Sequence, residues 1–90
     1  MERCTIAHYK KQGSSMYVNG GTLTVTYTDC IIEYMKREIA RFSMKETRAE
    51  IAPSELLYEG IRLSDGRQSI DIYFQKGSKS IKAVREHFNI

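Results

Sequence analysis

Short stretches of alternating hydrophobic and polar residues flank two turn dipeptides, Asn19-Gly20 and Asp65-Gly66. Glycine adopts positive φ angles freely, and asparagine and aspartate tolerate them, so these dipeptides favour the two-residue turns of β-hairpins. Threonine and tyrosine alternate with apolar residues around the dipeptides, which is typical of strands with one buried and one open face. The pattern therefore predicts two hairpins.

The register of each hairpin follows from the two-residue loop, because loop length fixes which residues lie opposite each other. For Asp65-Gly66 the predicted pairs are Ile61–Ile70, Leu57–Phe74, Tyr58–Tyr73, Arg62–Ser69 and Gly60–Asp71. For Asn19-Gly20, the prediction places Met16 opposite Leu23, with Val18, Val25 and Tyr27 on the same face. A one-residue slip would mix the apolar and polar sets, so this register separates them best.

Each hairpin leads into a segment whose apolar residues have helical spacing. Asp29 is a suitable N-cap for a helix that runs to about Phe42. Ser78 or Ser80 is a suitable N-cap for a second helix. The predicted apolar stripes are Ile32, Met35, Ile39 and Phe42 in the first helix and Ile81, Val84 and Phe88 in the second.

Two further segments, Arg3–Lys10 and Arg48–Ala52, favour strands. The predicted order is then strand-strand-strand-helix in residues 1–43 and again in residues 47–90, a pseudo-repeat compatible with duplication or with chance. A chain of 90 residues supports one domain. The predicted fold class is α+β: a small single domain, residues 1–90, with a mainly antiparallel sheet and two helices on one face.

The residues expected in the core share the apolar face of these elements. They are Met16, Val18, Leu23, Val25, Ile32, Met35, Ile39, Phe42, Leu57, Ile61, Ile70, Ile72, Phe74, Ile81, Val84 and Phe88.

The chain carries 14 basic and 11 acidic residues, a formal charge of +3, in an otherwise ordinary composition. This mild charge fits a nucleic acid, an acidic protein surface or no charged partner at all. No stretch is long and apolar enough to span a membrane, and the N-terminus lacks an apolar signal core. The two cysteines are too few for a disulfide framework. These features predict a cytoplasmic protein that does not enter a membrane.

Residues with catalytic or metal-binding chemistry are present but form no recognisable site. Cys4 and His8 share a face of the first predicted strand but lie roughly 13 Å apart along it, too far for one metal ion. Cys30 at a helix start would have a lowered pKa, yet the adjacent isoleucines favour a buried thiol. Glu59 and Asp71 fall on opposite faces of the second hairpin, which is wrong for paired catalytic carboxyls. We therefore expect a protein that is not an enzyme, with no metal, no cofactor and no small-molecule substrate.

If both helices cover one side of the sheet, the opposite side is open. The aromatic and basic residues predicted on or beside that face are Tyr17, Tyr58, Arg62, Tyr73 and Lys76. Tyrosine pairs across strands stabilise hairpins by about 0.2–1 kcal/mol whether or not they bind anything. Tyrosine and arginine are also typical anchors of protein interfaces. Alternatively, tyrosine rings stack unpaired bases while basic groups neutralise phosphates.

The leading hypothesis is a small non-catalytic binding or regulatory module that acts through protein contact, with a second copy of the chain, as a homodimer, or with another protein. The alternative is a single-stranded nucleic-acid binder, for RNA or DNA. The two differ in one structural requirement: nucleic-acid binding needs basic groups on the same face as the tyrosines.

Overall fold

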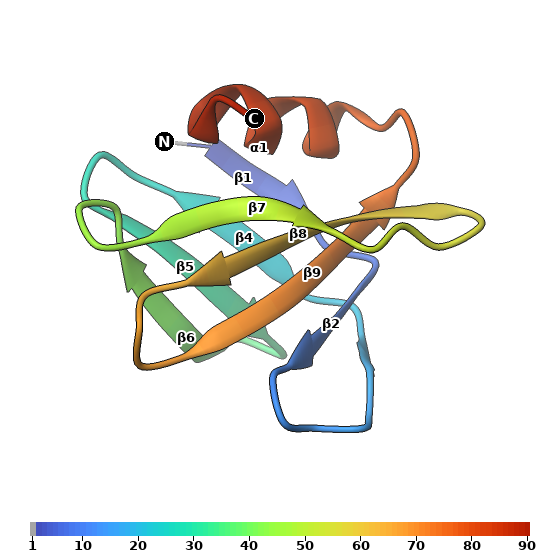
Figure 1. Ribbon diagram of the computed structural model, residues 1–90, viewed down its shortest axis with the longest axis horizontal. Helices are drawn as coiled ribbons and strands as arrows, with labels where there is room; N and C mark the ends of the chain where they lie inside the picture. Colours follow the sequence, from blue (N-terminus) through green and yellow to red (C-terminus); the bar gives the residue numbers. More distant parts are fainter. Residues whose placement is uncertain (1) are drawn as a thin grey trace.

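In a computed structural model, which describes residues 2–90, the chain forms two antiparallel sheets and one helix (Figure 1). The first sheet has the order β1 (Glu2–Thr5), β4 (Thr22–Val25), β5 (Asp29–Tyr34) and β6 (Arg37–Ser43). The second sheet has the order β3 (Val18–Asn19), β2 (His8–Lys11), β9 (Ser69–Gln75), β8 (Tyr58–Ser64) and β7 (Arg48–Ala52). The helix α1 (Lys79–Phe88) lies along one end of the sheets, where it packs beside β1.

The core lies between the two sheets, because alternate residues of each strand point inward. Ile32 of the first sheet and Ile61 and Ile72 of the second are fully buried in one cluster. Ile81 and Val84 of α1 join the same cluster. The prediction of a small, mainly antiparallel α+β protein is confirmed at this level.

The predicted helix from Asp29 to Phe42 is wrong, because this segment forms the hairpin of β5 and β6. The two central turn residues, Met35 and Lys36, have φ angles of 51° and 64°, as a two-residue hairpin turn requires. Neither residue is Gly, Asn or Asp, so the sequence gives no turn signal here. Two residues of the predicted helical stripe, Ile32 and Phe42, also fit strand alternation, and both are fully buried in the core.

The predicted hairpin at Asn19-Gly20 is also wrong. Asn19 ends β3, which pairs with β2 in the second sheet, whereas β4 pairs with β1 and β5 in the first. Gly20 and Gly21, with φ angles of 97° and 119°, carry the chain from one sheet to the other. The N–H of Gly20 donates to the carbonyl of Ala7 over 2.8 Å, which fixes the crossing.

The hairpin at Asp65-Gly66 exists, but its register differs from the prediction by two residues. The observed pairs are Ile61–Ile72, Leu63–Ile70 and Ser64–Ser69. The loop is longer than two residues because the Asp65 carboxylate accepts the N–H groups of Arg67 and Gln68, each over 2.9 Å. These hydrogen bonds lower the pKa of Asp65. A register shift of two residues leaves every side chain on the same face of the sheet. The predicted inner and outer faces of β8 and β9 are therefore correct.

The C-terminal helix is confirmed, and Ser78 is its N-cap: the hydroxyl accepts the N–H of Ile81 over 3.3 Å. It is the single helix of residues 2–90, so the predicted pair of helices is wrong. The pseudo-repeat of residues 1–43 and 47–90 is not supported either, since only the second half ends in a helix. The predicted strand from Arg3 to Lys10 divides into β1 and β2, and Arg48–Ala52 is β7.

Most of the predicted core is confirmed, with three exceptions that are exposed: Met16, Met35 and Leu57. Val18, Ile39 and Phe88 are only partly buried against the core. Met35 occupies a hairpin tip, and Leu57 lies in the loop before β8. Within residues 2–90, no helix is long and apolar enough to cross a membrane.

Candidate protein-contact surface

His8 on β2 is the centre of an aromatic cluster on the outer face of the second sheet, the face turned away from the core. Its ring stacks on Tyr73, with centroids 4.8 Å apart and ring planes 18° apart. Tyr58 and Tyr17 meet the imidazole edge-on, at centroid distances of 4.8 and 5.1 Å. Nε2 of His8 lies 3.0 Å from Oε1 of Glu55, and the carboxylate accepts a hydrogen bond from the ring N–H. These four rings, the His8 cluster, join residues far apart in the sequence.

A glycine makes room for this cluster. His8, Tyr73, Gly60 and Ala52 form one row across β2, β9, β8 and β7. A Cβ atom at Gly60 would lie 2.7 Å from Cε1 of Tyr73 and 3.0 Å from Cβ of Ala52. Glycine therefore lets the Tyr73 ring lie against the β8 backbone, and Tyr73 is only 4% exposed. Tyr73 therefore lies between the sheet backbone and the His8 ring, and it offers little area for contact with another molecule.

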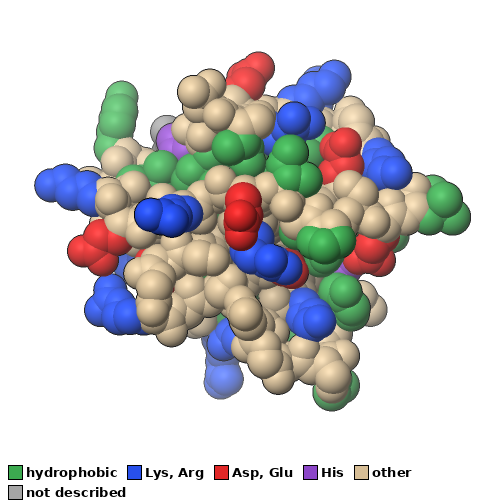
Figure 2. Space-filling view, viewed as in Figure 1, with side chains coloured by type: hydrophobic (Ala, Val, Ile, Leu, Met, Phe, Trp, Pro, Cys, Tyr) green, Lys and Arg blue, Asp and Glu red, His purple; other side chains and the backbone are tan. Residues whose placement is uncertain are grey.

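The next row of the outer face alternates in charge, with Lys10, Asp71, Arg62 and Glu50 side by side on the same four strands. Arg62 donates to Asp71 through Nε over 2.6 Å and through Nη2 over 3.0 Å, and this pairing raises the pKa of Arg62. The Lys10 ammonium lies 5.6 Å from the centroid of the Tyr17 ring. Figure 2 shows acidic and basic side chains alternating across this face. The row is internally compensated, so it gives the face little net charge.

Exposed apolar side chains border the His8 cluster. Leu56 and Leu57 lie in the loop between β7 and β8, and Met16 directly precedes Tyr17; all three are more exposed than buried. Two hydrogen bonds of Glu55 hold the loop beside the cluster. Its carboxylate bonds to the imidazole of His8, and its backbone N–H donates to the carbonyl of Tyr58 over 3.0 Å. We call Met16, Leu56 and Leu57 the apolar rim. Met16 directly precedes Tyr17 and Leu57 directly precedes Tyr58, so exposed apolar and aromatic side chains occur together at one end of the sheet.

The three predicted tyrosines do come together on the outer face. Tyr17 is 47% exposed, Tyr58 is partly buried and Tyr73 is buried. Tyr58 lies opposite Gln75 rather than opposite Tyr73, a consequence of the longer loop.

The two predicted basic residues differ in their availability. Arg62 is on the outer face but is paired with Asp71, and Lys76 is exposed just after β9. Sequence reasoning missed His8, because its partners depend on the pairing of β2 with β9, which has no local signal.

Two buried groups, Tyr73 on the outer face and Cys30 in the core, keep their protons at neutral pH. Burial, and after it the neighbouring Tyr17 and Asp71, raises the pKa of Tyr73 to about 12. Cys30 lies inside β5 rather than at a helix start, and burial raises its pKa to about 12. Neither group is therefore a base or a nucleophile under physiological conditions. Among the residues that the structure describes, no group of three or more His, Cys, Asp or Glu side chains could hold a metal ion.

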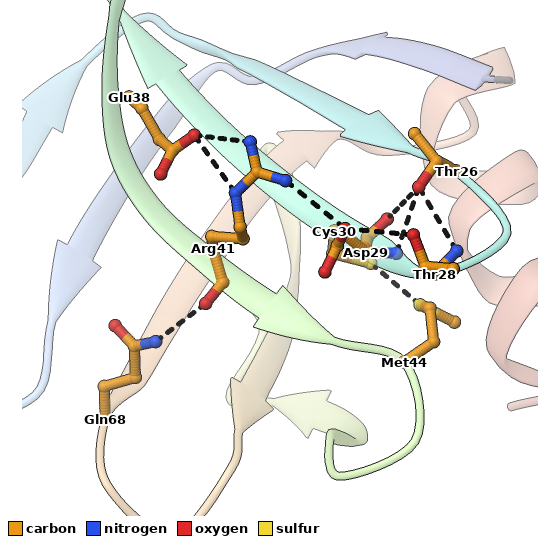
Figure 3. A network of polar contacts seen from close by, with 8 residues as sticks. All are labelled: Thr26, Thr28, Asp29, Cys30, Glu38, Arg41, Met44 and Gln68. Carbon is orange, nitrogen blue, oxygen red and sulfur yellow. Dashed lines mark hydrogen bonds and ion pairs between the residues drawn. The ribbon is translucent and has the colours of Figure 1, made fainter.

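The first sheet carries a separate polar network (Figure 3). Arg41 on β6 donates to Glu38 over 2.8 Å and to Asp29 over 3.3 Å. The hydroxyl of Thr26 accepts the N–H of Asp29 over 3.0 Å and closes the turn between β4 and β5. The side-chain amide of Gln68 donates to the carbonyl of Arg41 over 3.0 Å, which ties the β8–β9 turn to the edge of β6. This network holds turns and one sheet edge in place.

Comparison with known proteins does not extend this description: no protein-family model, no curated protein and no solved structure matches the chain.

Proposed function

We propose that the protein is a small non-catalytic binding module that acts through protein contact, with a second copy of the chain as its first partner. The contact surface consists of the exposed part of the His8 cluster, Tyr17 and Tyr58, together with the apolar rim. One observation supports this proposal. Exposed apolar side chains adjoin aromatic rings that the buried members of the cluster hold rigidly.

Rigidity matters here because ordering flexible side chains opposes association. Tyr17 and Tyr58 are both held against the imidazole, so little rotamer freedom remains to be lost on binding. Tyrosine combines a large apolar ring with a polar hydroxyl, which suits a surface that is exposed to water in the monomer and buried in the dimer. A domain of this length also buries a modest share of its surface when it folds alone, so association adds stability.

Sedimentation velocity over a concentration series tests the proposal directly. The wild-type chain is expected to shift from monomer to dimer within the micromolar range. The double variant Tyr17→Ser/Leu56→Ser should weaken that equilibrium by at least about tenfold, since tyrosine is a frequent anchor of such contacts and the leucine adds buried apolar area. Met35→Ser is the matched control, because it removes an apolar side chain that is 79% exposed, against 87% for Leu56, at a hairpin tip of the other sheet. A chain that stays monomeric at all concentrations refutes self-association.

Single-stranded nucleic-acid binding is the second candidate, and one observation favours it. The ammonium of Lys10 lies over the ring of Tyr17, so a cation and a half-exposed aromatic ring share the outer face. The other basic groups fit this function less well, because Arg62 is paired with Asp71 and the cations of α1 lie on the helix rather than on this face.

Fluorescence anisotropy with labelled single-stranded RNA, single-stranded DNA and duplex DNA at two salt concentrations tests this candidate. Binding to the single strands is expected to weaken as salt rises and to be lost in a Lys10→Gln/Tyr17→Ser variant. Lys45→Gln serves as the matched charge control, because Lys45 lies in the turn after β6, outside the second sheet. An absence of binding at low salt excludes the candidate.

A further inference from the structure

The outer edge of β7 is a free sheet edge in the part of the chain that the structure describes. β7 pairs only with β8. The edge of β6 is tied to Gln68, β1 packs beside α1, and β3 has only two residues. An uncovered edge offers a row of backbone donors and acceptors to any extended segment that approaches it.

The residues with free backbone groups follow from the hydrogen-bond alternation of antiparallel strands. The N–H of Asp65 donates to the carbonyl of Gln68 over 3.2 Å, directly after β8, so odd-numbered residues of β8 direct their backbone groups to β9. Even-numbered residues of β8 therefore face β7, and each lies opposite an even-numbered residue of β7. Ala49 and Ile51 consequently direct their N–H and C=O groups to the open edge.

A groove of about 190 Å³ runs beside this edge, between β7 and α1. Its apolar lining is Ile51, Ile61 and Ile81. Ile51 lies on the core side of β7 but is 58% exposed, because no strand covers it. Glu59 also lines the groove and is partly buried, and within the described residues its carboxylate has no hydrogen bond or ion pair. The guanidinium of Arg85 at the rim donates to a backbone carbonyl instead.

We propose that this groove binds an extended peptide of a partner protein, which adds to the β7 edge as a further strand. Backbone groups of the peptide pair with Ala49 and Ile51, and an aliphatic side chain packs on Ile61 and Ile81. A lysine or arginine two residues away pairs with Glu59, because Glu59 and Ile61 are successive residues on the inner face of β8. Backbone pairing supplies affinity and the two side chains supply selectivity.

A single extended segment fits this site better than a second copy of the chain. Ile81 and Arg85 of α1 form the far wall of the groove, so an added strand lies between β7 and the helix. Figure 1 shows α1 on the side of β7 that faces away from β8. A second copy would bring the rest of its own sheet into the space that α1 occupies, whereas a peptide brings only one strand. The site is separate from the contact surface around His8.

Two fluorescein-labelled synthetic peptides probe the site, Ser-Thr-Lys-Thr-Val-Thr-Ser and its reverse, so that both strand directions are sampled. Fluorescence anisotropy with the full chain is expected to show saturable binding of one of them. Ala49→Pro removes an edge N–H and should weaken binding about tenfold, while proline is tolerated where the N–H faces outward. A third peptide carries glutamine in place of the lysine. Glu59→Gln should weaken binding of the lysine peptide by about two- to fivefold and should not change binding of the glutamine peptide. Glu86→Gln on the exposed side of α1 is the matched control and should change nothing.

Several results would overturn the proposal. They are the absence of saturable binding by both peptides, unchanged affinity in a folded Ala49→Pro variant, and bound-state amide shifts that spare Ala49 and Ile51. If Ala49→Pro does not fold, Ile51→Lys places a charge in the groove at an already exposed position and must abolish binding. A dimer that Ala49→Pro dissociates would assign the edge to a second copy instead. Tyr17→Ser should leave peptide binding intact, so failure of the proposed contact surface and failure of this site are distinguishable.

Discussion

Replacing Gly60 with alanine tests the account of the His8 cluster, because two opposite effects compete at this position. An unhindered Gly→Ala substitution in a strand stabilises by roughly 0.5–1 kcal/mol, since the unfolded chain loses conformational freedom. At Gly60, however, the new Cβ would lie 2.7 Å from the Tyr73 ring and 3.0 Å from Cβ of Ala52. The ring must move, and its stacking on His8 is then disturbed.

The magnitude follows from these terms. Overpacking of a tightly filled position costs about 1–3 kcal/mol, and loss of a stacked aromatic pair costs about 0.5–1.5 kcal/mol where the ring is displaced completely. Subtracting the entropic gain leaves a net destabilisation of roughly 1–2 kcal/mol for Gly60→Ala. For a domain of this length, that corresponds to a fall in Tm of about 5–15 °C.

Chemical denaturation of wild type and Gly60→Ala measures the effect, and the background Tyr73→Val provides the control. With the ring removed, only the contact with Ala52 remains, so Gly60→Ala should become close to neutral or stabilising in that background. An equal loss of stability in both backgrounds, or a gain in the wild type, would refute the view that Tyr73 occupies the space above this glycine.

Three further predictions concern the core and its titration. The hydroxyl of Thr24 is buried and has no hydrogen-bond partner within residues 2–90. Thr24→Val should therefore raise the free energy of unfolding, measured in urea, by about 1 kcal/mol. A loss of stability would show that the hydroxyl does have a partner. Cys4 and Cys30 are buried with raised pKa values, so neither should react with an aromatic disulfide reagent at neutral pH until the chain is denatured; rapid labelling of folded protein would show that the core opens. The pKa of Tyr73 rises from 10.0 to about 12 on folding, so its contribution is fully present below pH 10.0 and is lost as the pH rises toward about 12. The stability of the wild type should therefore fall relative to that of Tyr73→Phe as the pH rises through that window, and parallel curves would contradict the shift.

The sequence predicted those elements whose signals are local. The helix α1 has a capping serine and buried residues at helical spacing, Ile81 and Val84, and both signals refer to positions within one or two turns. The hairpin of β8 and β9 was recognisable from Asp65-Gly66, but its register depended on the side-chain bonds of Asp65 in the loop. Those bonds lengthened the loop, and the length of a loop cannot be read from the dipeptide alone.

The errors arose where the decisive contacts are distant or the periodicity is ambiguous. Ile32 and Phe42 satisfy helical spacing, yet strand alternation buries both of them equally well, and the pairing of β5 with β4 decided between helix and strand. The outer face was predicted with its tyrosines because alternation is local. The central imidazole was not, because His8 reaches Tyr73 only through the pairing of β2 with β9.

The segment of residues 2–11 also sets the order in which this protein can fold. Its first part, β1, pairs with β4, and its second part, β2, pairs with β9 at the opposite end of the chain. Between them, the N–H of Ile6 donates to the carbonyl of Gly21 and the N–H of Ala7 to that of Tyr73. During synthesis β2 has no partner in its sheet beyond the two residues of β3 until residues 69–75 have left the ribosome. Closing so long a loop is slow, so β2 stays without its main partner for most of translation, whereas the strands of the first sheet, all within residues 2–43, can pair much earlier.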